Sequence, residues 1–500
     1  MATHLLSTYY KQAGLNEDLP FAKNLKMPFA AFEHQVSGLN QALVHNRFGL
    51  FDEPGAGKSL VAQAWSIYYA HHGSKVVVVM PPTLLTQFYN TFSTNFVGFD
   101  NYFTKHVLNQ PPKKRAELYA DWYETEWPDM LLVSYQMFLR EHREFMKAGY
   151  EVLCADEAHA LKKSTSLIHS SVARFLGGKI EDTALLLMTG TPIPNTLEDT
   201  YGMIKLMSPK AYTNRKQWDR KHGVFVKKGN SADPNKKSWM ELVGFQNQKE
   251  LAKNMYRCAR RILKNDVFSL DKPIIDYLPV TLDPTHLSLY KKLIKERFLE
   301  LEEELIDATT AQSLRMKSLQ MVTNPQRFKD AKIESSIVKT VTEKLDSIGI
   351  ESKEKCVLVA NFRHSIELLM ETYAHLNPAV LYGGTKGPRQ AQVDKFVKDE
   401  TCRLVIIHPE SGGVGIDGFQ LVCKYMIFVE PTSVPGLFKQ SSERLVRPGQ
   451  KHVVNIWIVK ALATVSPALI RNMLRKEGEA QQVNCDRTTM LSELMGQEAS

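Results

Sequence analysis

A short segment, Asp52–Ser59, has the residue types and spacing of a loop that binds the phosphates of a nucleotide. An apolar run precedes it, and helix-compatible residues follow from Lys58 onward. Two glycines flank Ala56, so the backbone can bend tightly and bring its amide groups close to an anion. Lys58 would place a positive charge on the outer phosphates, and the hydroxyl of Ser59 would coordinate Mg2+. The residues predicted to hold the triphosphate are Gly55, Ala56, Gly57, Lys58 and Ser59.

The match to the phosphate-loop pattern is incomplete at one position. The full pattern has a glycine five residues before Gly57, and this chain has Asp52 there. A glycine turn that joins a strand to a helix and binds nothing is therefore the alternative interpretation. The helix that follows would point its positive N-terminal end at the phosphates, which favours the nucleotide site.

Asp156 and Glu157 stand at the end of another apolar run, Val152–Asp156. A strand that delivers adjacent carboxylates is suited to hydrolysis of a magnesium-bound nucleotide. Asp156 would hold the metal, directly or through water, and Glu157 would orient and deprotonate the attacking water. An acidic turn without chemistry is the alternative, but the phosphate loop upstream favours the catalytic interpretation.

Two arginines in the second half of the chain, Arg444 and Arg447, could complete the site. They are three residues apart and would share one face if their segment is helical. Arginines of this kind neutralise the charge that develops on the transferred γ-phosphoryl group, and surface arginines on an amphipathic helix are the alternative. A phosphate loop in the first half and arginines in the second predict a nucleotide bound between two domains.

The elements that must position these groups are short apolar runs separated by helix-length segments. Such runs are typical of strands buried on both faces, so we predict an α/β fold with a parallel sheet covered by helices in each half. Functional residues of such sheets lie at the carboxyl ends of the strands. The predicted strands are Phe48–Asp52, Lys75–Met80, Met130–Ser134, Val152–Asp156 and Ala184–Met188, and then Ile274–Leu282, Cys356–Ala360, Ala379–Tyr382, Leu404–His408, Tyr425–Val429 and Val453–Val459. Helices are predicted at Leu287–Leu305, Ser365–Ala374 and Arg389–Val397.

Residues 208–270 are polar and basic, with no strand periodicity. Between Lys205 and Asp266 there are 16 Lys or Arg against 5 Asp or Glu, a surplus of 11 positive charges in a chain whose net charge is +9. This surplus is the electrostatic footprint of a nucleic-acid partner, and a solvated helical surface is the alternative. We predict a first domain at 1–270 that includes this basic segment, a second at 271–480 and a polar tail at 481–500.

The composition narrows the class of protein. Five hundred residues, of which 43% are hydrophobic and 23% charged, are typical of a soluble protein with more than one domain. The longest apolar runs, such as Val76–Met80, are too short to cross a membrane, and the N-terminus lacks the pattern of a secretion signal. Six cysteines without C-x-x-C pairing are expected to be reduced thiols, with no structural metal, in a cytoplasmic protein.

Several motifs, in a fixed order, resemble those of the Swi/Snf-like ATPases of helicase superfamily two. Asp52–Ser59 resembles the D-E-x-G-x-G-K-T loop of that family, which tolerates Asp at the position of the missing glycine. Asp156–Ser164 is similar to D-E-x-H-x-L-K-N, and Met188–Asn195 is similar to L-T-G-T-P-I-x-N. Gln440–Gln450 matches Q-x-x-x-R-x-x-R-x-G-Q at every fixed position.

Four further segments fit the same family. Phe32–Gln35 resembles the adenine-reading Q motif, with His34 in place of the usual tyrosine. Pro81–Leu85 resembles the P-x-S-L-L motif that touches the DNA backbone. Ser411–Ile416 resembles A-G-G-x-G-I, and Arg261–Val267 resembles the R-x-x-K-x-D-V brace between lobes.

The resemblance covers residues 28–460 and implies two RecA-like lobes that use ATP and Mg2+ to translocate on double-stranded or branched DNA. It places the basic segment where the family carries helical protrusions from the first lobe. It also assigns Gln35 and Gly415 to the nucleotide, Ser59 and Asp156 to the metal, Pro82 and Thr83 to nucleic acid, and Thr189, Gly190, Thr191, Gly412 and Gly413 to the coupling of hydrolysis to DNA.

Within the basic segment, Trp218, Phe225 and Trp239 could stack on bases, but we expect them to pack beneath the protrusion. The D-E-A-H spelling also occurs in strand-separating helicases that act on RNA or forked DNA, so that activity remains an alternative. A nucleotide-gated DNA-binding scaffold with little turnover is another, although Glu157 and both arginines argue against it.

The chain is short for the Swi/Snf-like family and has no room for an appended histone-reading or zinc module. We therefore expect a compact microbial or viral motor that acts as a monomer. Its expected location is the cytoplasm, either near the nucleoid or inside a viral host cell.

Overall fold

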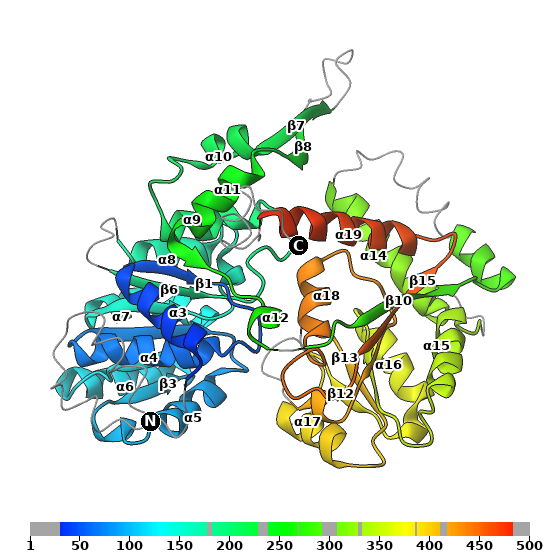
Figure 1. Cartoon of the computed structure of the whole chain (residues 1–500), viewed down its shortest axis with the longest axis horizontal. Helices are drawn as coiled ribbons and strands as arrows, with labels where there is room; N and C mark the ends of the chain where they lie inside the picture. The colour runs from blue at the N-terminus through cyan, green and yellow to red at the C-terminus, as the bar shows by residue number, and fades with distance from the viewer. Residues whose placement is uncertain are drawn as a thin grey trace. The chain divides into compact units, whose positions relative to one another are not determined.

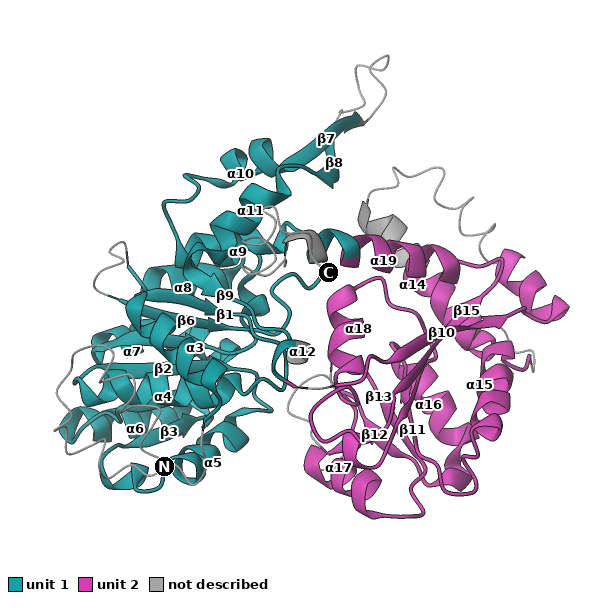
Figure 2. Cartoon of the chain, viewed as in Figure 1, with its two compact units in different colours: residues 1–267, 478–500 teal, residues 268–477 magenta. Residues whose placement is uncertain are grey.

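The computed structural model describes residues 31–177, 183–228, 239–268, 270–292, 308–328, 333–385, 388–410 and 418–483. The chain forms two compact units, shown in Figure 2, which we call unit 1 (residues 1–267 and 478–500) and unit 2 (residues 268–477). The boundary predicted from the sequence, at residue 270, lies a few residues further along the chain. Each unit contains a parallel sheet with helices around it, so the predicted α/β fold class is confirmed.

The described part of unit 1 has a seven-stranded sheet in the order β3-β4-β2-β5-β6-β1-β9, and every neighbouring pair is parallel. Its strands are β1 (Arg47–Leu50), β2 (Lys75–Met80), β3 (Lys105–Leu108), β4 (Met130–Ser134), β5 (Tyr150–Ala155), β6 (Ala184–Met188) and β9 (Ala259–Arg260). Val76 and Val78 of β2 pack into one core cluster, and Val77 and Val79 pack into the other. Because both faces are covered, the strand is apolar at consecutive positions.

The helices of unit 1 include three that begin at a side-chain cap. Ser134, Ser166 and Asn214 each accept a hydrogen bond from the backbone amide three residues later, which satisfies one free donor at the helix start. The helices are α3 (Glu33–Val44), α4 (Lys58–His71), α5 (Leu85–Asn95), α6 (Pro112–Glu124), α7 (Tyr135–Lys147), α8 (Leu167–Phe175), α9 (Asp199–Met207), α10 (Arg215–His222), α11 (Gln248–Met255) and α12 (Lys264–Val267), with 3-10 turns at Phe99–Asn101, Ala158–Leu161 and Tyr256–Cys258.

The prediction that residues 208–270 contain no strand is wrong. This segment includes β9 and an antiparallel hairpin of β7 (Gly223–Lys228) and β8 (Trp239–Phe245), in addition to α10 and α11. These two strands lack the alternation of apolar and polar residues by which a strand is recognised in a sequence. The hairpin does not pack on a sheet, so its valines and methionine are exposed and do not alternate between core and solvent. Trp218 is fully buried, as expected, but Trp239 is half exposed, so the prediction that it packs beneath the segment is also wrong.

The described part of unit 2 has a six-stranded parallel sheet in the order β10-β15-β14-β11-β13-β12. Its strands are β10 (Ile274–Val280), β11 (Cys356–Val359), β12 (Ala379–Leu381), β13 (Leu404–Ile407), β14 (Tyr425–Phe428) and β15 (Asn455–Ala461). Its helices are α14 (Ala308–Thr323), α15 (Ser336–Ser347), α16 (Arg363–Thr372), α17 (Arg389–Lys398), α18 (Pro435–Ser442) and α19 (Ser466–Val483), the last of which ends within unit 1, with 3-10 turns at Pro325–Phe328, Ala374–Leu376 and Phe419–Leu421.

Two predicted segments of the second half fall partly outside the described residues. Residues 284–292 are helical, which includes the first six residues (287–292) of the predicted charged helix Leu287–Leu305, and residues 293–307 lie outside. Most of the predicted polar tail, residues 484–500, lies outside as well. No helix among the described residues combines the length and the apolar character needed to cross a bilayer.

Glu430, directly beyond β14, is a fully buried carboxylate in unit 2. Its oxygens accept hydrogen bonds from the backbone amide of Asn361 (2.6 Å) and the hydroxyl of Ser365 (2.5 Å), which join the loop after β11 and helix α16 to β14. Burial nevertheless raises the pKa of Glu430 to about 7, because the hydrogen bonds that the carboxylate accepts only partly replace the lost water.

This pKa predicts a specific dependence of stability on pH. The folded pKa lies above the unfolded value of 4.5, so the contribution of Glu430 is complete below about pH 4.5 and is lost as the pH rises through about 7. Glu430→Gln mimics the protonated acid and removes this loss, which amounts to roughly 3 kcal/mol. Urea unfolding between pH 5 and 8 should show the wild type losing more stability than Glu430→Gln, with the exposed Glu410→Gln as control. Parallel pH profiles for wild type and Glu430→Gln would contradict the assignment.

Candidate nucleotide site

The predicted site residues of the first half gather at one edge of the sheet of unit 1. The phosphate loop follows β1, Pro82 and Thr83 follow β2, Asp156 follows β5 and Thr189 follows β6. Because these strands are parallel and adjacent, their carboxyl ends meet at the same edge. Pro82 and Thr83 are exposed in the turn before α5, and their predicted contact with nucleic acid stays a prediction.

The phosphate loop has the backbone that its glycines make possible. Gly55 and Gly57 have φ angles of 90° and 81°, in the left-handed region that residues with a Cβ rarely adopt. Gly57 is the N-cap of α4, so the free amides at the start of this helix and the exposed Ser59 lie at the loop. The Lys58 ammonium donates to the carbonyl oxygen of Asp52 at 2.6 Å and so spans the loop from its last residues to its first.

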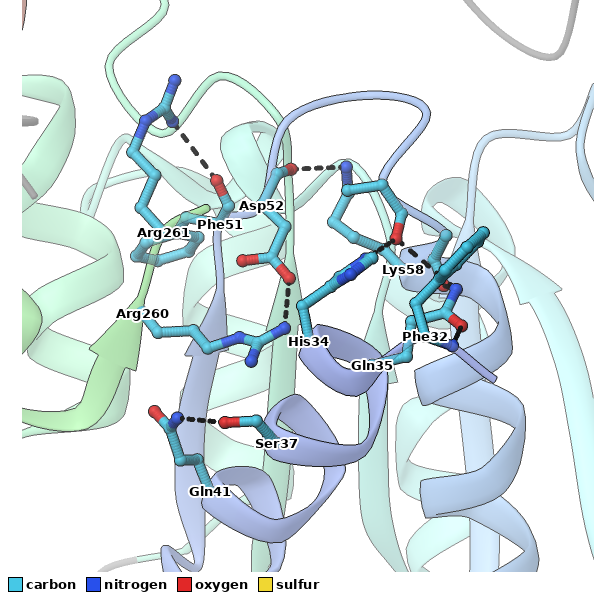
Figure 3. A network of polar contacts seen from close by, with 12 residues as sticks. Phe32, His34, Gln35, Ser37, Gln41, Phe51, Asp52, Lys58, Arg260 and Arg261 are labelled. Atoms are coloured by element: carbon cyan, nitrogen blue, oxygen red, sulfur yellow. Dashed lines mark hydrogen bonds and ion pairs between the residues drawn. The ribbon is translucent and has the colours of Figure 1, made fainter. Parts of the chain in front are cut away.

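Asp52, the residue at the position of the missing glycine, forms a buried ion pair. Figure 3 shows its carboxylate facing Arg260 of β9, with Nη2 of the arginine 2.5 Å from Oδ2 of the aspartate. Both side chains are more than nine-tenths buried. An isolated charge at such a position would be strongly unfavourable, and each group supplies the opposite charge that the other needs. The aspartate that stands in place of the expected glycine therefore connects the loop to strand β9.

The residue after Arg260 reinforces this contact. The Arg261 guanidinium donates to the carbonyl oxygens of Phe51 (3.2 Å) and Gly190 (3.3 Å), and it lies 3.4 Å from the carboxylate of Glu53. Backbone hydrogen bonds from Phe51 to Arg260 and from Glu53 to Ile262 run alongside. The segment Arg260–Ile262 is therefore hydrogen-bonded to the residues on both sides of Asp52, namely Phe51 and Glu53. Arg260 was not predicted as a site residue. The one local indication that Asp52 needs a positively charged partner was its presence at the position of a glycine.

Gln35 and His34 hold the other side of the loop. The Gln35 amide nitrogen lies 3.5 Å from the carbonyl oxygens of Ala56 and Gly57, and its oxygen accepts from the Phe32 amide at 3.0 Å. His34 Nε2 lies 2.8 Å from the Ala56 carbonyl oxygen (Figure 3). These contacts place Gln35 beside the phosphate loop, and its role as adenine contact stays a prediction.

Asp156 is set at the sheet edge by backbone contacts. Its amide donates to the Val79 carbonyl (2.8 Å), its carbonyl accepts from the Tyr135 hydroxyl (2.7 Å), and its carboxylate accepts from the Glu157 amide (2.9 Å). Although some surface remains exposed, protein groups surround the carboxylate, and the resulting desolvation, with the negative charge of Glu157, raises the pKa of Asp156 to about 7. The positive charge of Lys58 opposes this rise. A carboxylate at the same sheet edge as the exposed hydroxyl of Ser59 fits a divalent cation such as Mg2+.

Glu157 connects the end of β5 to the segment after β6. It has a left-handed backbone (φ 50°), which is unusual for a residue with a side chain and typical of functional positions. Its Oε2 lies 3.2 Å from Nδ1 of His159 and 3.4 Å from the hydroxyl of Thr189, which in turn accepts from the Thr191 amide at 3.1 Å. Glu157 is therefore linked by hydrogen bonds to the Thr189–Thr191 segment.

The Thr189–Thr191 segment also packs against the phosphate loop. A Cβ atom added at Gly190 would lie 2.4 Å from Cδ of Pro54, so a glycine is required for this approach. Thr189 and Thr191 are buried. Two contributors to the site, His159 and Pro54, were part of the motifs recognised in the sequence but were not predicted as site residues.

The remaining predicted residues lie in the second half of the chain. Arg444 and Arg447 follow the end of α18 at Ser442 and occupy a series of turns, so the condition for a shared helical face is not met. Gln450 holds these turns by donating to the carbonyl oxygens of Cys423 (2.9 Å) and Leu445 (3.4 Å). The role of the arginines stays a prediction. Gly412, Gly413 and Gly415 lie outside the described residues.

Among the described residues there is no cluster of three or more His, Cys, Asp or Glu side chains that could hold a metal ion. The assignment of Ser59 and Asp156 to Mg2+ stays a prediction.

Comparison with known proteins identifies the class to which this site belongs. The chain matches the family model described as the SNF2-related domain over residues 34–331, more than half of its length. The match begins one residue before Gln35 and includes the phosphate loop, both carboxylates and β9. The chain therefore belongs to the SNF2-related domain family, and the predicted membership of the Swi/Snf-like family is confirmed.

Individual relatives are distant. An uncharacterized ATP-dependent helicase of Mycoplasma pneumoniae is 24% identical over 87% of this chain, and the DNA repair protein rhp54 of Schizosaccharomyces pombe is 24% identical over 85%. The chain spans 40% and 54% of the length of these two relatives. Among solved structures, the SWI2/SNF2 ATPase core of Sulfolobus solfataricus in complex with dsDNA matches 96% of this chain and 100% of its own, with 18% identity and a TM-score of 0.40.

The packing around Gly57 predicts the effect of adding one methyl group to the loop. The Cβ of Gly57→Ala would lie 2.0 Å from the Gln35 amide nitrogen, in addition to the backbone strain of a φ of 81°. Gly73→Ala has the same strain (φ 84°) but no atom within 4 Å, and serves as the matched control. Both variants should lose about 1–2 kcal/mol of stability.

Only Gly57→Ala should also lose affinity for a fluorescent ATP analogue, by more than about tenfold, because the loop must move away from Gln35. Equal nucleotide affinity in the two variants would show that the contact with Gln35 does not shape the loop.

Proposed function

We propose that this chain is a DNA-dependent ATPase motor that moves along double-stranded or branched DNA and remodels the DNA or the proteins bound to it. The observation that carries the proposal is the convergence of the Lys58 loop, the Asp156–Glu157 pair and Thr189 at one sheet edge, in a chain of the SNF2-related domain family. The family match supports the use of ATP. Magnesium, the preference for duplex or branched DNA over RNA, and action as a monomer are part of the proposal.

Each side chain has a distinct part in the proposed hydrolysis. Lys58 and the amides at the start of α4 bind the outer phosphates, and Ser59 and Asp156 hold Mg2+, which would neutralise phosphate charge when bound. Glu157 accepts a proton from the attacking water. Arg444 and Arg447 of unit 2 supply the positive charge that the transferred phosphoryl group requires. The contacts of Glu157 with His159 and Thr189 are suited to report the state of the nucleotide to the rest of unit 1.

Three lines of support point to DNA as the partner. The basic segment between Lys205 and Asp266 has 11 surplus positive charges, which favours a phosphate backbone. One relative carries the description of a DNA repair protein, and the solved SWI2/SNF2 core was determined with dsDNA. Binding that depends on phosphate contacts should weaken steeply as salt increases. The proposed location in the cytoplasm or at the nucleoid follows from this partner.

Two variants test the proposed chemistry. Lys58→Ala removes the charge on the phosphates, and Glu157→Gln removes the proton acceptor but preserves its shape, so each should lower DNA-stimulated ATP turnover by about 10²–10⁴-fold. DNA affinity, measured by fluorescence anisotropy without nucleotide, should change by less than about twofold, since neither side chain lies in the basic segment. Near-normal turnover in either variant would contradict the roles assigned here.

The type of motion can be tested separately from hydrolysis. Displacement of a third strand from an intact duplex reports translocation, and displacement of one strand of a forked duplex reports strand separation. The proposal expects triplex displacement that requires ATP and is abolished in Glu157→Gln. Strand displacement without triplex displacement would instead support the strand-separating helicase.

A further inference from the structure

The β7–β8 hairpin of unit 1 is a projecting ribbon with a firmly held base. Figure 1 shows it extending from α10 and α11 away from the sheet of the unit. At the base, the Gln246 amide donates to the His222 carbonyl (2.8 Å), and the Asn247 side chain donates to the Lys221 carbonyl (2.7 Å). The buried Trp218 ring lies beside Phe245, with ring centres 6.3 Å apart. These contacts hold the direction in which the ribbon leaves the unit.

In the described part of the ribbon, apolar side chains are exposed at the end away from the base. Trp239 and Met240, the first residues of β8, are 51% and 59% exposed, and Val226 of β7 is 45% exposed. Trp239 and Met240 are consecutive in a strand, so they point to opposite faces. Their partners in the ladder are Lys228 and Lys227. A two-stranded ribbon with apolar residues exposed on both faces gains nothing from folding by itself, and such surfaces usually mark a binding site.

The charge around the ribbon selects the kind of partner. Lys227 at the exposed end is itself exposed, and so are Lys216 and Arg220 of α10 and Lys253 and Arg257 at and after α11. The same window carries the main positive surplus of the chain. Glu241 is the carboxylate on the described part of the ribbon. Cations beside exposed aromatic and apolar groups fit a nucleic acid, whose phosphates bind the cations and whose bases have apolar faces.

We propose that the β7–β8 hairpin binds unpaired bases at a junction between duplex and single-stranded DNA, with Trp239 stacked on a base and Lys227 at the phosphates. Bases inside an intact duplex stack on one another and present no free face, so an aromatic group at the end of a ribbon gains most where base pairs are open. This inference rests on the proposed function, a DNA motor, and adds to it the substrate class: forked or branched DNA. It corrects the expectation that Trp239 packs beneath the basic segment.

The test compares forked DNA with intact duplex of the same length. Trp239→Ala should weaken binding to the fork by about 5- to 150-fold, the range expected for loss of one base–aromatic stack, and leave duplex affinity within about twofold. Trp239→Phe retains a ring and should recover most of the loss. Leu167→Ala, at an exposed apolar residue of α8, is the matched control and should change neither affinity. A 2-aminopurine base at the junction should be quenched by the wild type and not by Trp239→Ala.

The outcomes separate this inference from the proposed function. If DNA stimulates ATP turnover in the wild type but Trp239→Ala binds forks and duplexes as the wild type does, the hairpin proposal fails and the motor stands. An equal loss on both substrates would also overturn the proposal, since it would indicate a general backbone contact. If no DNA stimulates turnover in the wild type, the proposed function itself fails. A loss that is confined to the fork and recovered by Trp239→Phe supports the hairpin as a junction-binding element.

Discussion

The buried ion pair between Asp52 and Arg260 is the interaction on which the geometry of the candidate site depends. Removing one partner from such a pair typically costs about 3–5 kcal/mol, because the remaining charge is buried without compensation. The pair joins the first residue of the phosphate loop to the last residue of β9, 208 positions later in the chain. Since the Lys58 ammonium donates to the backbone carbonyl of the same aspartate, the position of this lysine depends on that of β9.

This arrangement gives a physical reason for tight communication within unit 1. Gly190 contacts both Pro54 of the loop and Arg261, and Thr189 contacts Glu157, so the loop, Glu157 and the segment at β9 are connected through residues 189–190. The chain continues from β9 through α12 into unit 2. A change at the loop on nucleotide binding or hydrolysis would therefore act first on the segment that leads to the second sheet. We regard this covalent route as the simplest way in which hydrolysis could be coupled to motion.

Sequence reasoning succeeded where a local pattern reflects burial on both faces of a strand, and failed where the decisive contact is distant or solvent-exposed. The first and last residues of β2, β4 and β6 match those of the predicted strands, because successive residues of each strand pack alternately into the two core clusters of unit 1. The missed strands β3 and β9 are the edges of the sheet, short and covered on fewer sides. No local pattern could pair Asp52 with Arg260. The turns that carry Arg444 were predicted as a possible helix because three-residue spacing alone does not show where α18 ends.

The most direct test of the central claim is a double-mutant cycle on nucleotide affinity with Asp52→Ala, Arg260→Ala and the combination of both. If the ion pair positions the loop, each single variant weakens binding of a fluorescent ATP analogue by about tenfold or more, and the double variant is no weaker than either, which is the non-additivity expected of two directly interacting residues. Independent effects, in which the loss in the double variant equals the product of the two single losses, would contradict the account.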